Sequence, residues 1–151
     1  MKETPQEKRI RARMMPGIIT LTGFLGKDKR SISEIVSADE STLENLGRTP
    51  DEVAARMQFF TDATFDVFDA KVVLENKYEI ETEVTRGKLS CPYSHGGLIR
   101  KLITTLTNRK NGLTVRWTAL NIHLIKEHHF FEGKGSTFRL EPADLVKALF
   151  D

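Results

Sequence analysis

The sequence predicts a single α+β domain: a small antiparallel sheet that includes a hairpin near residues 67–90, packed by several short helices. The chain has 151 residues, which is enough for one ordinary core. Its 39% hydrophobic and 29% charged residues are typical of a soluble globular protein. Helix and strand patterns follow one another without the regular strand–helix–strand repeat of a parallel sheet, which favours the α+β class.

The first residues are polar and charged. We expect residues 1–15 to form a polar arm that is flexible or loosely helical, and residues 16–151 to form the α+β domain. The arm lacks the apolar segment of a secretory signal, and a single cysteine excludes an internal disulfide. No apolar run approaches the roughly 20 residues that span a membrane. We therefore expect a cytoplasmic protein without a membrane partner.

Capping residues and β-branched runs predict the elements of the N-terminal half. Thr49, Pro50 and Glu52 make the strongest helix start, because Thr49 caps the helix, Pro50 suits its first turn and Glu52 completes a capping box. We expect a strand over 18–25 and helices over 31–38, 41–46 and 49–64.

Alternating glutamates predict the hairpin. From 75 to 84, glutamates alternate with apolar residues and threonine, so the glutamates share one face of a strand. We expect this strand to pair with 71–74 across a turn at Asn76-Lys77, and to end at a second turn at Arg86-Gly87. We interpret the glutamate row as the solvated face of the strand.

Residues 91–139 hold most of the reactive side chains. They include the only cysteine, the only tryptophan and all four histidines, and eight Lys/Arg against two carboxylates give them a charge of +6. An apolar stripe predicts a helix over 97–108, and Thr118 predicts the start of another helix that runs to Phe131. Strands are expected over 113–117 and 136–140, and a last helix is expected from Pro142.

Some of these residues have the spacing of zinc ligands. Three residues separate Cys91 from His95, and four separate His123 from His128, as in many structural zinc sites. Side chains five positions apart on a regular helix point about 140° apart, so we do not expect His123 and His128 to share an ion. Glu127 does share a face with His123. The predicted zinc site is therefore Cys91, His95, His123 and Glu127.

Three residues are candidates for catalysis. Cys91 precedes a predicted helix start, which favours a thiolate nucleophile, and His95 is its candidate base. The alternative for Cys91 is a packed, unreactive cysteine. His128 and Asn121 interrupt the apolar face of the predicted 118–131 helix. They are either hydrogen-bonded core residues or they line a pocket in which His128 acts as an acid or base.

Two turns predict anion-binding amides. The first precedes the predicted helix at 97, where free amides bind anions. The second follows Phe131 and resembles part of a phosphate-binding loop, although a glycine stands where a Walker motif needs Ser or Thr. The predicted ligand-binding residues are Ser94, Gly96, Gly97, Asn121, Lys134, Gly135 and Ser136.

The leading functional interpretation is a binding or regulatory module that contacts an anionic ligand through the basic 91–139 region, with nucleic acid among the candidates. Two alternatives stay open. One is a metal-dependent or thiol hydrolase that uses Cys91 and the histidines. The other is a homo-oligomeric structural module.

Overall fold

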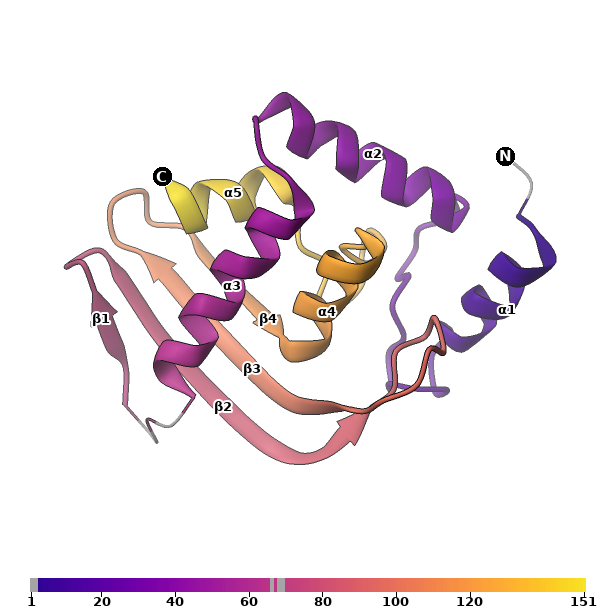
Figure 1. Cartoon of the computed structure of the whole chain (residues 1–151), viewed down its shortest axis with the longest axis horizontal. Helices are drawn as coiled ribbons and strands as arrows, with labels where there is room; N and C mark the ends of the chain where they lie inside the picture. The colour runs from indigo at the N-terminus through magenta and orange to yellow at the C-terminus, as the bar shows by residue number, and fades with distance from the viewer. Residues whose placement is uncertain (1–2, 66, 68–69) are drawn as a thin grey trace.

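One antiparallel sheet, with strands in the order β1-β2-β3-β4, forms the base of the computed structural model (Figure 1). The structure describes residues 3–65, 67 and 70–151. The predicted α+β class is confirmed, and so is the hairpin, which β1 (Val72–Leu74) forms with β2 (Tyr78–Leu89). Residues 68–69 of the predicted hairpin region lie outside the described residues. The other strands are β3 (Ile99–Asn108) and β4 (Thr114–Thr118).

The described residues form five helices: α1 (Pro5–Arg13), α2 (Ile32–Asn45), α3 (Pro50–Thr64), α4 (Ala119–His128) and α5 (Pro142–Phe150). The helix start at Thr49 is confirmed, since Thr49 and Glu52 exchange the two hydrogen bonds of a capping box, at 3.1 and 3.2 Å. Within the described part of the chain, none of the helices is both long and apolar enough to cross a membrane.

The 97–108 helix prediction is wrong, because residues 99–108 form β3. Leu102, Thr104, Leu106 and Asn108 are buried beneath the helices, and the residues that alternate with them are partly exposed, so the true period is two. The strand pairs along one edge with β2 and along the other with β4. Its apolar residues also happen to fit a helical stripe, which is why the periodicity misleads.

The other errors concern turns and boundaries. Residues 18–25 and 136–140 form turns and loops instead of strands; Gly23 N–H, for example, donates to Thr20 Oγ1 at 2.9 Å. The predicted turn at Arg86-Gly87 is a register shift within a continuous β2. The helices expected over 31–38 and 41–46 are the single α2, because no breaker lies between them. The helix from Thr118 ends at His128, not Phe131.

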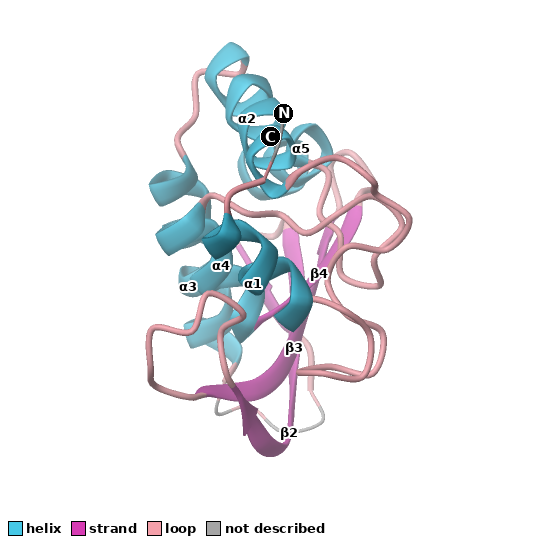
Figure 2. Ribbon diagram, turned by 90° about the vertical axis from the view of Figure 1, so that its right-hand side faces the viewer, coloured by secondary structure: helices cyan, strands magenta, loops and turns pink. Residues whose placement is uncertain are grey.

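Two hydrophobic clusters hold the described elements together. The larger one lies between the sheet and α3, α4 and α5, which cover the same face of the sheet (Figure 2). Trp117 and Phe60 are fully buried in it. The smaller cluster joins α1, α2 and the outer side of α4, and contains Ile10, Met14 and Cys91. The N-terminal segment therefore includes a helix that packs on the rest of the chain.

Candidate metal centre

The loop between β2 and β3 is built around Cys91. The cysteine is 3% exposed and follows the end of β2. Ser94 N–H donates to Cys91 O at 2.9 Å and closes a turn in which Ser94 takes a left-handed conformation, φ 59°. Tyr93 N–H donates to Cys91 Sγ at 3.4 Å. The turn therefore points backbone donors at the sulfur and projects His95 from its far end.

Helix α4 supplies the other half of the centre. Thr118 Oγ1 accepts from Asn121 N–H at 2.9 Å, and Asn121 Oδ1 accepts from Thr118 N–H at 2.9 Å, so a capping box begins the helix. The helix ends where His129 takes a left-handed conformation, φ 55°. This termination makes His128 the last helical residue, beside the Cys91 loop.

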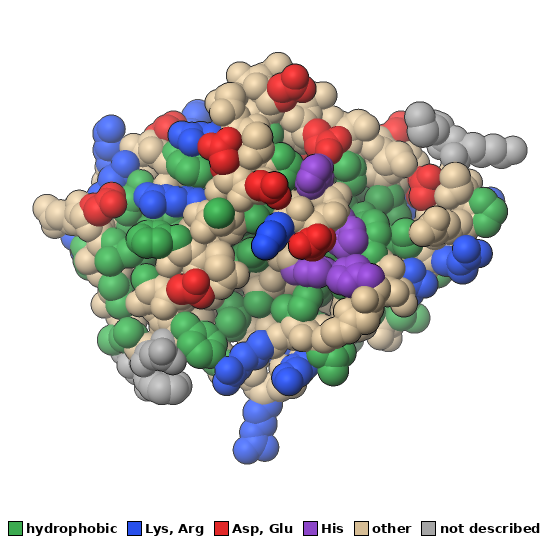
Figure 3. Space-filling model, viewed as in Figure 1, with side chains coloured by type: hydrophobic (Ala, Val, Ile, Leu, Met, Phe, Trp, Pro, Cys, Tyr) green, Lys and Arg blue, Asp and Glu red, His purple; other side chains and the backbone are tan. Residues whose placement is uncertain are grey.

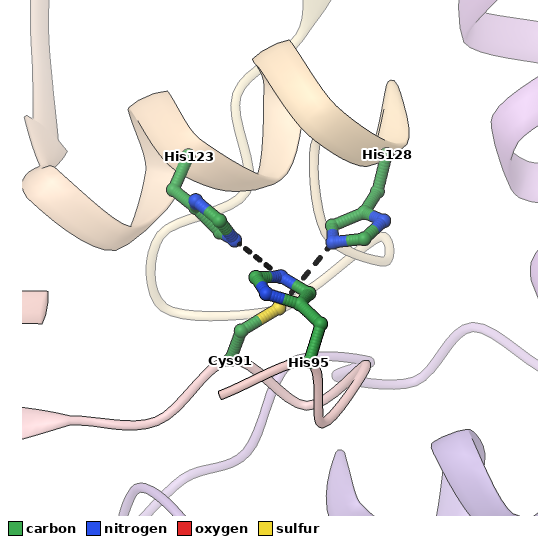
Figure 4. A group of neighbouring side chains, drawn as sticks. All are labelled: Cys91, His95, His123 and His128. Carbon is green, nitrogen blue, oxygen red and sulfur yellow. Dashed lines mark hydrogen bonds between the residues drawn. The ribbon is translucent and has the colours of Figure 1, made fainter. Parts of the chain in front are cut away.

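Four side chains converge between the loop and α4 (Figure 4). We call Cys91, His95, His123 and His128 the four-ligand group: one ligand atom from each lies within 4.8 Å of the others. His95 Nε2 is 2.8 Å from His123 Nε2, and Cys91 Sγ is 3.5 Å from His128 Nε2. The histidine side chains reach the surface as one patch on the helical face (Figure 3).

These separations are close to those of a tetrahedral zinc site. Zn–N bonds of about 2.0–2.1 Å and Zn–S bonds of about 2.3 Å require ligand atoms roughly 3.4 Å apart for N–N pairs and 3.6 Å for N–S pairs. The distance between Cys91 Sγ and His128 Nε2, 3.5 Å, already matches the N–S separation. Shifts of about 1 Å at the side-chain ends would bring the remaining atoms to tetrahedral positions around one ion.

The expectation that His123 and His128 diverge is wrong. Their ring centroids are 5.6 Å apart, and both rings extend from α4 toward the loop (Figure 4). The separation of about 140° holds for the Cβ directions of a long regular helix. An imidazole extends well beyond its Cβ atom, and His128 is the last residue of the helix. Glu127, the predicted fourth ligand, is exposed and lies outside the four-ligand group.

The electrostatics favour neutral imidazoles. Burial lowers the pKa of His128 to about 4, with a further contribution from the neighbouring His123 and His95. Burial also lowers the pKa of His123, and His95 adds to this. The pKa of the Cys91 thiol is raised by burial, against which the Tyr93 and Ser94 amides act. His123 and His128 are therefore neutral and ready to bind a metal at neutral pH, and the thiol must lose its proton as the metal binds.

The residues around the group hold it in place. Tyr93 stacks on His128, with ring centroids 3.7 Å apart and planes 6° apart. Arg13 Nε, at the end of α1, donates to Pro92 O at 2.5 Å and so fastens the loop to α1. Sequence reasoning did not select Tyr93; its position two residues after the cysteine, within the loop, was the available signal.

The other predicted ligand-binding residues fall into two places. Ser94, Gly96 and Gly97 lie exposed in the Cys91 loop, and no helix follows them. Asn121 is fully buried, and its Nδ2 donates to Glu132 Oε2 at 3.0 Å. This hydrogen bond gives the buried Asn121 amide a partner inside the core. The sequence alone did not identify Glu132 as that partner.

The Lys134–Ser136 turn is engaged within the chain. Lys134 N–H donates to Asp28 Oδ2 at 3.1 Å, and Ser136 N–H donates to Gly133 O at 3.1 Å. The Lys134 N–H is thus already bonded to the Asp28 carboxylate and is not free to bind an anion. Arg139, counted in the basic region, is buried and pairs with Asp39 at 2.5 Å.

Comparisons with protein-family models, with curated proteins and with solved structures found no match for this chain. The fold and the four-ligand group are therefore the basis for any functional inference.

Proposed function

We propose that this protein binds one zinc ion through Cys91, His95, His123 and His128, and that the ion has a structural role. The observation that carries the proposal is the convergence of one sulfur and three imidazole nitrogens within 4.8 Å. The four donors come from two segments, the 91–95 loop and α4, which no disulfide joins. A bound ion would join them.

The donor set favours zinc over the other common metals. Thiolate and imidazole together suit zinc, whereas magnesium and calcium require oxygen ligands. Four protein ligands make a closed tetrahedral site, which is the structural type, since a catalytic zinc keeps a position for water. The spacing, with three residues between the first two ligands and four between the last two, also lies within the usual range for structural zinc sites.

The hydrolase alternative has less support. Cys91 is 3% exposed and burial raises the pKa of its thiol, and both features oppose a role as a nucleophile at neutral pH. Its imidazole hydrogen-bond partner is His128, at 3.5 Å, whereas the predicted base His95 pairs with His123. The anionic ligand, the homo-oligomer and the cytoplasmic location stay predictions.

The test is metal content together with cobalt spectroscopy on the full chain. We expect one zinc per chain after purification, and a thiolate-to-cobalt charge-transfer band after exchange with Co²⁺. His123→Ala and His128→Ala should each reduce zinc retention during dialysis against a chelator, and Cys91→Ser should abolish the charge-transfer band.

His129→Ala is the matched control. His129 is adjacent to His128 but pairs with Glu40 at 2.5 Å, outside the four-ligand group. Its replacement should leave the zinc content unchanged. A wild-type chain without stoichiometric metal, or a His129→Ala chain that loses as much as His128→Ala, would overturn the proposal.

A further inference from the structure

A cavity of about 290 Å³ lies between the 19–24 segment, the end of β2, the beginning of β3, Leu120 of α4 and Phe138. Its wall is mainly apolar and includes Ile19, Phe24, Leu102, Leu120 and Phe138. Ligand sites typically measure about 300–1,000 Å³, so this cavity suits a small molecule.

One acidic side chain belongs to the wall. Glu132 lines the cavity and is only 4% exposed. Asn121 Nδ2 donates to one of its oxygens at 3.0 Å, and Ser136 Oγ donates to the other at 2.5 Å. A carboxylate accepts more hydrogen bonds than these two, so it retains acceptor capacity.

The Glu132 carboxylate forms no ion pair in the described part of the chain, although the charge of Arg139 acts to lower its pKa. The nearby Arg139 guanidinium donates to the Glu132 backbone oxygen at 2.8 Å and forms its ion pairs with Asp39 and Glu141. Burial raises the pKa of Glu132 to about 7, as expected for a desolvated carboxyl without a paired cation. A buried carboxylate is stabilised when a cation reaches it.

The wall of the cavity also includes cationic residues. Lys101 lines it and is exposed, and strand alternation places Lys101 on the same face of β3 as Ile103. Arg100 also lines the cavity, and its guanidinium lies 4.9 Å from the centroid of the Phe65 ring. The cavity thus combines an apolar wall, a buried acid and an exposed lysine.

We propose that this cavity binds a small amino-carboxylate with an apolar body, the chemistry of an apolar amino acid. Its ammonium group pairs with Glu132, its carboxylate pairs with Lys101, and its side chain fills the apolar wall. The occupant supplies the cation that the buried carboxylate lacks. This binding site does not depend on the zinc proposal, because none of the four ligands lines the cavity.

The test compares three matched probes by calorimetric titration of the full chain: phenylalanine, phenethylamine without the carboxylate, and 3-phenylpropionate without the amine. Leucine, methionine and tryptophan are titrated as well, to test amino acids with other apolar side chains. We expect the amino acids to bind more tightly than either monofunctional probe. Binding should release close to one proton near pH 6, about one unit below the pKa of Glu132, and almost none near pH 8.

Two variants test which residue binds the ammonium group of the ligand and which binds its carboxylate. Glu132→Gln should weaken the amino acid and the amine by about 10- to 100-fold and leave 3-phenylpropionate unchanged. Lys101→Met should weaken the amino acid and the acid but not the amine. Lys88→Met, at an exposed lysine near the end of β2 that does not line the cavity, is the control and should change none of them.

Two outcomes would overturn the proposal: no amino acid binding at about 10 mM, or 3-phenylpropionate binding as tightly as phenylalanine. The proton-release measurement uses the wild-type chain and keeps the test valid if Glu132→Gln fails to fold. The titrations are run on zinc-loaded and chelated protein, and Glu132→Gln should retain the wild-type zinc content, so failure of one proposal is separable from failure of the other.

Discussion

The ring of Tyr93 lies parallel to the imidazole of His128, with the centroids 3.7 Å apart. The same residue donates its backbone N–H to Cys91 Sγ at 3.4 Å. One loop residue thus orients two members of the four-ligand group that lie 37 positions apart in the sequence. Residues that orient metal ligands commonly change metal affinity by about 10- to 100-fold when replaced.

We predict that Tyr93→Ala weakens zinc binding by about 10-fold, because His128 loses the ring that fixes its orientation. Tyr93→Phe keeps the stacked ring and the backbone N–H, and should bind zinc like the wild type. Competition with a chromophoric chelator measures both affinities. Equal affinities for the alanine and phenylalanine variants would show that the stack does not position His128.

Zinc should also stabilise the fold. An ion at 100 times its dissociation constant adds about 2.7 kcal/mol to the free energy of unfolding. We predict that chelation lowers the melting temperature of the wild type and increases hydrogen exchange in the 91–98 loop, which α1 contacts through Arg13. A His123→Ala/His128→Ala chain is the control, and its melting temperature should not respond to zinc. A wild type that melts at one temperature with and without zinc would contradict the structural role.

Sequence patterns located the region of the candidate metal centre but not the full four-ligand group. Cys91, His95 and His123 were selected from spacing, and the structure places all three in the group. The sequence favours Glu127 over His128 because a helical wheel shows only the direction of each side chain. It does not show how far a side chain extends or where the helix ends. That end depends on His129 adopting φ 55°, which is unusual for a residue other than glycine.

The fold was predictable wherever local chemistry agreed with tertiary pairing. The capping box at Thr49 determined α3, and glutamate alternation identified β2. In β3 the two disagreed: Leu102 and Leu106 are spaced by four, which fits one helix face as well as one strand face. Thr104 and its β-branched neighbours favour a strand, and pairing on both edges of β3 decides the outcome.

Stability should depend on pH through Glu132. Its pKa is raised to about 7 in the folded chain from an ordinary value of 4.5, so the folded state binds more protons than the unfolded state between these values. Stability from this group is therefore fully present below about pH 4.5 and is lost as the pH rises through 7. The difference amounts to about 3 kcal/mol.

Urea unfolding of the wild type and Glu132→Gln at about pH 5 and pH 8 measures this dependence. We predict that the glutamine variant gains about 2.5 kcal/mol relative to the wild type over that interval, because its side chain does not ionise. Glu44→Gln removes an exposed carboxylate of α2 and should show no such change. A Glu132→Gln difference that is the same at both pH values would contradict the raised pKa.

Arg139 and Asp39 form a buried ion pair that joins the segment before α5 to α2. Their side chains are each 7% exposed, with contacts of 2.5 and 2.9 Å. We predict that Asp39→Ala lowers the free energy of unfolding by about 3–5 kcal/mol, because the guanidinium stays buried without its main partner. Glu141, the exposed partner of Arg139, is the control: Glu141→Ala should cost less than about 1 kcal/mol in urea unfolding. Equal losses for the two variants would show that burial does not decide the strength of these pairs.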